Sequence, residues 1–159
     1  MEVIYRPIGV IHTSFNNVEE MPIQPTSDVS GPGIVEVSPE FADALKDLEG
    51  FSHIYLLYHF HKVHRSKLIV TPFLDSKSHG IFATRAPSRP NPLGLSLVKL
   101  VRIENNLVYV EGVDVLNGTP LLDIKPYVPE FEHIHDVRIG WLEKAKDKIR
   151  SQKSDDRFG

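Results

Sequence analysis

The segment of the chain richest in residues that could do chemistry runs from Arg85 to Pro92 and reads Arg-Ala-Pro-Ser-Arg-Pro-Asn-Pro. Its prolines fix their own φ angles and hold the residues before them extended, so the loop is stiff before any ligand arrives. The guanidinium groups of Arg85 and Arg89 suit a carboxylate or a phosphate, and Asn91 can both donate and accept hydrogen bonds. The pattern predicts a preorganised loop that binds an anion and a base edge or amino-acid group, with an ordinary structural turn as the alternative.

A second polar segment follows between Asp114 and Pro129. It contains Asn-Gly, which permits a tight turn with positive φ. Further on, Asp123 and Lys125 alternate with leucine and isoleucine, so the two charged residues share one face of a short strand. They are either part of a ligand site or a solvated ion pair.

The histidines form two His-x-His patterns. His59 and His61 point to the same face if their strand continues, which is credible geometry for a metal ion, and His133 and His135 repeat the spacing. No glutamate stands at the spacing of a metalloprotease helix. We therefore predict no metal, and interpret the histidines as lining a polar cleft or a nucleic-acid surface.

Composition narrows the class of protein further. The chain of 159 residues has no cysteine, which removes disulfides and thiolate metal sites and fits a reducing cytoplasm. The net charge is -3, yet Asp75 and Glu104 enclose a stretch that has basic residues and no acidic one, as suits an anionic ligand or a nucleic acid. We find no signal peptide and no apolar run long enough for a membrane helix, and expect a cytoplasmic protein. Rossmann and Walker glycine patterns are absent from the sequence.

The elements that must position these residues are mainly strands. Apolar alternation and turn residues predict strands at 3–11, 34–37, 53–60, 68–73, 80–84, 95–103, 107–116 and 121–124. A helix is predicted from the Ser38 cap to Gly50, a long loop over 19–33, and a helix past residue 138. This pattern favours a mainly β fold, an antiparallel sheet that closes into a barrel or sandwich with one or two peripheral helices. Residues 1–139 form the expected domain, and residues 140–159 a C-terminal helix and tail.

Three segments of the sequence resemble those of a known family. Residues 80–85 (Gly-Ile-Phe-Ala-Thr-Arg), 89–96 (Arg-Pro-Asn-Pro-Leu-Gly-Leu-Ser) and 117–127 (Asn-Gly-Thr-Pro-Leu-Leu-Asp-Ile-Lys-Pro-Tyr) are similar to the signature blocks of the TrmO family. Residues 8–11, and 51–53 through 60–61, fit as well. The resemblance covers about Val3 to Pro129.

This resemblance implies a small antiparallel β-barrel methyltransferase, unlike the Rossmann type, that works as a homodimer with S-adenosyl-L-methionine. The implied substrate is N6 of threonylcarbamoyl-adenosine beside the anticodon of threonine tRNA. The implied cofactor contacts are Pro25, Thr26, Ser27, His61, Lys62, Arg89, Leu97, Leu121, Leu122, Asp123 and Ile124. The expected substrate contacts are Arg85, Asn91, Lys125 and Tyr127.

Methyl transfer to this nitrogen requires in-line geometry and benefits from a group that accepts its proton. We predict Asp123 as the acceptor because it lies beside the implied cofactor contacts, with Asp114 and His61 as alternatives. Two other functions stay open: a non-catalytic barrel that binds RNA or a small ligand, and a metal-dependent enzyme built on the histidines.

Overall fold

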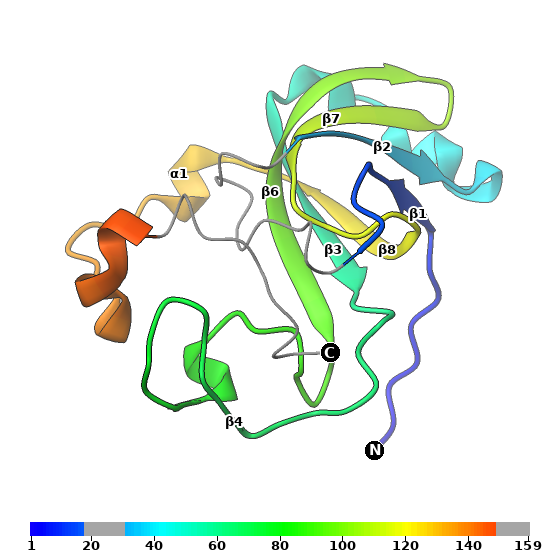
Figure 1. Cartoon of the computed structure of the whole chain (residues 1–159). Coiled ribbons are helices and arrows are strands. Elements are labelled where there is room, and N and C mark those ends of the chain that lie inside the picture. Colours follow the sequence, from blue (N-terminus) through cyan, green and yellow to red (C-terminus); the bar gives the residue numbers. More distant parts are fainter. Residues whose placement is uncertain (18–30, 149–159) are drawn as a thin grey trace.

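Six antiparallel strands close into a barrel in the part of the chain that the structure describes, residues 1–17 and 31–148 of a computed structural model (Figure 1). Around the barrel the order is β1, β2, β7, β6, β3, β8, and β8 pairs with β1 to complete the circle. The bounds are β1 (Gly9–His12), β2 (Gly31–Val37), β3 (His53–His59), β6 (Leu93–Glu104), β7 (Leu107–Val113) and β8 (Thr119–Pro126). The prediction of a small, mainly β, antiparallel barrel is confirmed.

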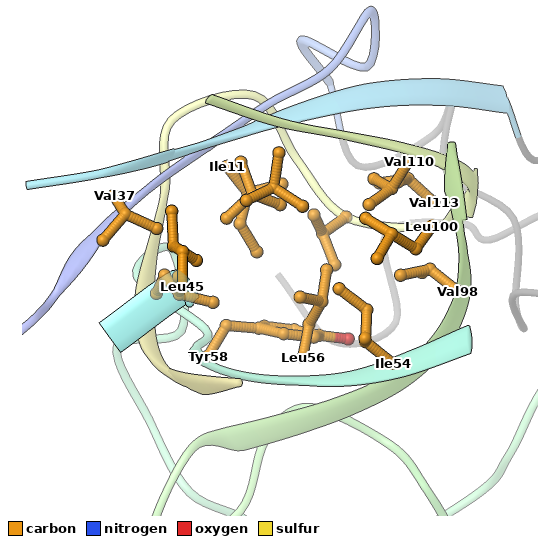
Figure 2. Close-up of a cluster of buried hydrophobic side chains, with 14 residues drawn as sticks. Ile11, Val37, Leu45, Ile54, Leu56, Tyr58, Val98, Leu100, Val110 and Val113 are labelled. Atoms are coloured by element: carbon orange, nitrogen blue, oxygen red, sulfur yellow. The ribbon is translucent and has the colours of Figure 1, made fainter. Parts of the chain in front are cut away.

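The side chains of β3 alternate between the barrel interior and its surface. Ile54, Leu56 and Tyr58 are buried, while the residues between them are only partly buried. Figure 2 shows these three side chains in one cluster with apolar side chains from β1, β2, β6 and β7. Burying each such side chain contributes about 1.5–3 kcal/mol. Slipping β3 by one residue would turn all of them outward, so the core fixes which residues face the surface.

The predicted hairpin between β6 and β7 is confirmed, with its turn at Asn105 and Asn106. Asn105 adopts a φ of 55°, a conformation that asparagine tolerates better than most residues. Asn106 anchors the turn, since its Nδ2 donates to the Val37 carbonyl at 2.7 Å.

The chain between β3 and β6, residues 60–92, leaves the barrel and forms a side lobe. It contains the two-stranded sheet of β4 (Ile69–Val70) and β5 (His79–Gly80), followed by the 3-10 helix η4 (Ile81–Ala83). Val70, Ile81 and Ala86 form a small apolar cluster of their own, against which Phe73 packs. In Figure 1 the side lobe is the green region beside the barrel.

The helix predicted over 38–50 is helical in the structure but is not one continuous helix. The structure has two 3-10 helices, η2 (Pro39–Leu45) and η3 (Leu48–Gly50), and the Ser38 side chain makes no cap hydrogen bond. Asp47, with a φ of 68°, separates them. Leu45, at the end of η2, and Leu48, at the start of η3, both pack on the barrel core. The turn at Asp47 therefore divides the segment into two short helices that both reach the core.

Several predicted strands are shorter than expected, among them the first strand and the strands of the side lobe. The first begins at Gly9 instead of Val3, because pairing with β2 and β8 starts there and residues 1–7 are exposed. In the side lobe, only Gly80 of the predicted strand 80–84 belongs to β5. The next three residues turn as η4, and the Thr84 hydroxyl donates to the Ile81 carbonyl at 2.9 Å to close that turn.

The C-terminal helix is also of the 3-10 type. The described part is η5 (Gly140–Lys148), preceded by the short α-helix α1 (Pro129–Glu132). Residues 149–159 lie outside the described residues. Among the helices of the described residues, none has the length and apolar character that a membrane crossing requires.

Candidate active site

The strands β1, β3 and β7 all end at the same end of the barrel, as the antiparallel order requires, so the connections after β3 and β7 start there. One connection is the side lobe, and another is the loop 114–118 between β7 and β8. This loop is held by Asn117, whose Oδ1 accepts from the Thr13 amide at 3.1 Å, and by Gly118, whose amide donates to the Ile11 carbonyl at 2.9 Å. The predicted tight turn at Asn-Gly is confirmed, with a φ of 82° at Gly118. Both polar segments found in the sequence thus start or end at this end of the barrel.

A buried chain of polar groups lies inside this end. Ser96 Oγ donates to Asp114 Oδ1 at 2.5 Å, and Ser96 Oγ also lies 2.8 Å from the Tyr58 hydroxyl. Because the single serine proton points to the carboxylate, the tyrosine donates to the serine. The three residues expose 1% (Ser96), 8% (Asp114) and 3% (Tyr58) of their surface. We call this set the buried triad.

Burial dominates the electrostatics of the buried triad. It raises the pKa of Asp114 to about 6, against the opposing effects of the Ser96 hydrogen bond and the positive charge of Arg85. Burial and the charge of Asp114 raise the pKa of Tyr58, so the phenol stays neutral. Asp114 is therefore ionised at neutral pH but holds a proton in mildly acidic solution.

On the outside of the barrel, β6, β3 and β8 carry the second part of the site. Across these strands, Tyr55 lies between Leu97 and Lys125, and in the next row Leu57 lies between Leu95 and Asp123. A register shift between Leu57 and Tyr58 accommodates one extra residue of β8. We call these six outward residues the outer face.

The predicted shared face of Asp123 and Lys125 is confirmed, since Asp123 Oδ2 lies 3.0 Å from Lys125 Nζ. Both side chains are about half exposed, so the pair is a weak contributor to stability and stays available to a ligand. Beside them, Tyr127 meets the Tyr55 ring edge-on at 5.8 Å. The outer face therefore combines a carboxylate, an ammonium group, one phenol ring and leucine side chains, with the Tyr127 ring at its edge.

Arg85 connects the side lobe with both parts of the site. Its positive charge opposes the rise in the pKa of Asp114 and Tyr58 within the triad, and that of Tyr55 on the outer face. The pKa of Tyr55 is raised by desolvation and by Glu132. Arg85 itself is exposed, as is Asn91, and both can meet a ligand at this end of the barrel.

The second arginine has a different position. Arg89 Nη1 donates to the carbonyls of Thr84 at 2.8 Å, Ile81 at 3.2 Å and Ala86 at 3.3 Å. Lys67 N–H also donates to the Ser88 carbonyl at 2.9 Å. The predicted stiff loop is thus held by the arginine as well as by its prolines.

His59 and His61 do not have the same-face arrangement that the metal-binding alternative requires. β3 ends at His59, so the strand alternation that would align His61 with it does not continue. Desolvation is the main cause that lowers the pKa of His61, and the charges of Lys62 and His59 lower it further. Within residues 1–17 and 31–148, no group of three or more histidine and acidic side chains is arranged to hold a metal ion.

The structure brings the predicted site residues together in part. Leu97, Asp123, Lys125 and Tyr127 share the outer face or its edge, while His61, Lys62 and Asn91 lie beside the barrel end, close to where Phe60 N–H donates to the Pro92 carbonyl at 2.8 Å. Leu121 is fully buried in the barrel core, so a ligand can meet only its backbone, whereas Ile124 is partly buried and packs against the core. Pro25, Thr26 and Ser27 lie outside the described residues.

The sequence interpretation missed Tyr58, Ser96 and Tyr55. The signal for Ser96 is present: it alternates with Gly94 and Val98 on the apolar face of a strand, where a hydroxyl needs a partner. Tyr58 shows the same signal at the end of an apolar alternation in β3.

These features define the class: a small closed β-barrel with a polar site at one end and along one outer face. Residues 10–133 match the family described as the tRNA-methyltransferase O N-terminal domain. The chain therefore belongs to the TrmO family, as the sequence blocks predicted.

Comparison with individual relatives supports this family assignment. The chain is 52% identical to a probable S-adenosyl-L-methionine-binding protein of Pyrococcus abyssi, over 98% of this chain and 85% of that protein. It is 34% identical to the tRNA (adenine(37)-N6)-methyltransferase of Rattus norvegicus, over 82% of this chain but 32% of the rat protein. The crystal structure of TrmO from P. aeruginosa superposes with a TM-score of 0.74 at 38% identity, over 90% of this chain and 62% of that one.

Proposed function

We propose that this protein is an S-adenosyl-L-methionine-dependent methyltransferase that methylates N6 of adenosine 37 in tRNA. The observation that carries the proposal is the outer face, where the Asp123–Lys125 pair lies beside Leu97 and Tyr55, in a chain of the TrmO family. The family relatives named for binding S-adenosyl-L-methionine and for methylating tRNA adenine support it.

The residues present fit this cofactor by their chemistry. S-adenosyl-L-methionine has a carboxylate, an ammonium group, ribose hydroxyls and a flat adenine ring, and it supplies an electrophilic methyl group on a cationic sulfur. On the outer face, Asp123 can accept from the ammonium group or from hydroxyls, and Leu97 offers apolar contact to a ring. The predicted cofactor contact Asp123 lies directly against the predicted substrate contact Lys125, as expected where donor and acceptor meet.

The acceptor nitrogen must lose a proton when its bond to the methyl carbon forms. We propose Asp123 for this proton, since its carboxylate is half exposed on the outer face. Asp114 is the second candidate: a carboxyl group with a pKa of about 6 is a stronger base than an ordinary aspartate, but it lies within the barrel end, bonded to Ser96. His61 is the third.

Matched variants distinguish the two carboxylates. With Asp123 as the acceptor, Asp123→Asn lowers kcat by about 100-fold or more, and Asp114→Asn keeps most of the turnover. If Asp114→Asn abolishes turnover and removes the acidic limb of the pH–rate profile, while Asp123→Asn is active, the role moves to Asp114.

More specifically, the proposed substrate is the threonylcarbamoyl form of this adenosine in threonine tRNA. Arg85 and Lys125 supply the cations that a threonyl carboxylate requires, and Asn91 can pair with the carbamoyl group. The test compares threonine tRNA with and without the threonylcarbamoyl group, digested to nucleosides after incubation and measured by mass spectrometry. Equal methylation of both tRNAs would remove this requirement.

We also propose a homodimer, supported by Leu93 at the start of β6, which lies outside the outer face and exposes 43% of its surface. Sedimentation equilibrium tests it, and a monomer at micromolar concentration would contradict it. A barrel that binds RNA without turnover is the second candidate function, and the tRNA assay separates it from the enzyme.

A further inference from the structure

An aromatic ring lies exposed on the side lobe. Phe82 exposes 78% of its surface, although its neighbour Ile81 is buried in the lobe's apolar cluster. The ring belongs to η4, outside both the buried triad and the outer face. Neither the fold nor the proposed methyl transfer accounts for it.

The backbone that carries this ring is fixed on several sides. Arg89 Nη1 donates to the carbonyl groups before and after Phe82, those of Ile81 and Thr84. Trp141 Nε1, from η5, donates to the Ala83 carbonyl at 2.8 Å. A ligand that stacks on the ring therefore meets a surface that is already ordered, at a low entropic cost.

The side lobe that carries the ring has a positive net charge. Residues 60–92 hold six lysines and arginines against the single acidic residue Asp75, a formal charge of +5 in a chain of net charge -3. Asp75 is itself paired with His79 at 2.7 Å. The Arg89 guanidinium carbon lies 5.9 Å from the centre of the Phe82 ring. Such a mixture of cations and an exposed aromatic ring is typical of proteins that bind single-stranded nucleic acid.

We propose that Phe82 is a stacking platform for an unpaired base of the RNA substrate, with the side-lobe cations holding the neighbouring phosphates. This inference rests on the proposed function. A second copy of the chain fits the ring less well, because a symmetric contact through Phe82 would bring two lobes of charge +5 together.

The test uses hairpin RNAs with the anticodon stem and loop of threonine tRNA, each carrying 2-aminopurine at one unpaired position, titrated with the full chain. Stacking on wild-type protein should change the fluorescence at one loop position. Phe82→Leu, which keeps an apolar side chain but removes the aromatic plane, should lower RNA affinity about tenfold and abolish that change. Phe82→Trp should retain both.

Leu68→Ala is the matched control. Leu68 exposes 69% of its surface, and its carbonyl accepts from the Ile81 amide, so it borders η4 without a ring. We expect wild-type RNA binding from this variant. Binding of S-adenosyl-L-methionine and the thermal midpoint of Phe82→Leu should also equal those of wild type.

The outcomes separate this inference from the proposed function. Wild-type RNA affinity in Phe82→Leu, with tRNA methylation intact, would overturn the platform and leave the methyltransferase. Equal losses in Leu68→Ala and Phe82→Leu, or weaker self-association without a change in RNA affinity, would also overturn the platform. No RNA binding or methylation by wild-type protein would overturn both.

Discussion

Ser96 Oγ donates to Asp114 Oδ1 at 2.5 Å inside the end of the barrel where the side lobe begins. The bond joins β6 to the first residue after β7, and Tyr58 adds β3. Three strands are thus linked by one polar chain in an apolar interior. Substitutions in this polar chain should therefore affect the stability of the protein differently from substitutions on the outer face.

The pH dependence of stability follows from Asp114. Its pKa is about 6 in the folded protein, above the usual value of 3.8, so the native state binds this proton more tightly than the unfolded chain. The resulting stabilisation is complete below about pH 4 and is lost as the pH rises through 6, a change of about 3 kcal/mol. Asp114→Asn, whose amide oxygen can still accept from Ser96, should remove this slope in urea unfolding between pH 4 and 7. A slope parallel to that of wild type would contradict the assignment.

Asp123→Asn is the matched control for this measurement. It removes the carboxylate of a half-exposed ion pair, so the loss of unfolding free energy should be below about 1 kcal/mol.

Close packing in the triad leads to a second prediction, at Gly94. A Cβ atom there would lie 2.1 Å from the nearest atom of the Tyr58 ring, which is fixed between the core and Ser96. Gly94→Ala should therefore lower the free energy of unfolding by about 1–3 kcal/mol, measured by urea denaturation. Gly50→Ala, where a Cβ atom meets nothing within 4 Å, should lose less than half as much. Equal effects of the two substitutions would show that the ring is free to move.

The contact between η5 and the side lobe gives a third prediction. Trp141 stacks on the His79 ring at 4.7 Å and donates to the Ala83 carbonyl. Trp141→Phe keeps a ring for stacking but removes the N–H, so amide exchange at Thr84, which is bonded to Ile81, should become faster. Lys144→Ala, at an exposed position of η5, is the control. Unchanged exchange at Thr84 in Trp141→Phe would show that this hydrogen bond does not hold η4.

Strand positions were predictable because the side chains along a strand point alternately into a single core and away from it. The alternation of Ile54, Leu56 and Tyr58 indicates both a strand and its inward face, and the same argument puts Asp123 and Lys125 on one side of β8. The helix over 38–50 was predicted as one continuous helix because its cap residues and apolar spacing do not reveal the turn at Asp47 that divides it into two 3-10 helices.

The site was predictable only as separate segments. The motifs indicated Arg85, Arg89 and Asn91, but the sequence could not apportion the two arginines among ligand groups. Arg89 bonds three carbonyls of its own lobe, and Arg85 is exposed near the triad. This difference depends on the turn at η4, where a strand was expected.

Methylation of tRNA by the purified chain tests the central claim most directly. Threonine tRNA lacking the methyl group is incubated with protein and S-adenosyl-L-methionine, digested to nucleosides and measured by mass spectrometry, with Asp123→Asn as the control. The account predicts a methyl group on N6 of the adenosine at position 37 with wild-type protein, and at least about 100-fold slower formation with the variant. Folded wild-type protein that binds the tRNA and the cofactor but transfers no methyl group would contradict it.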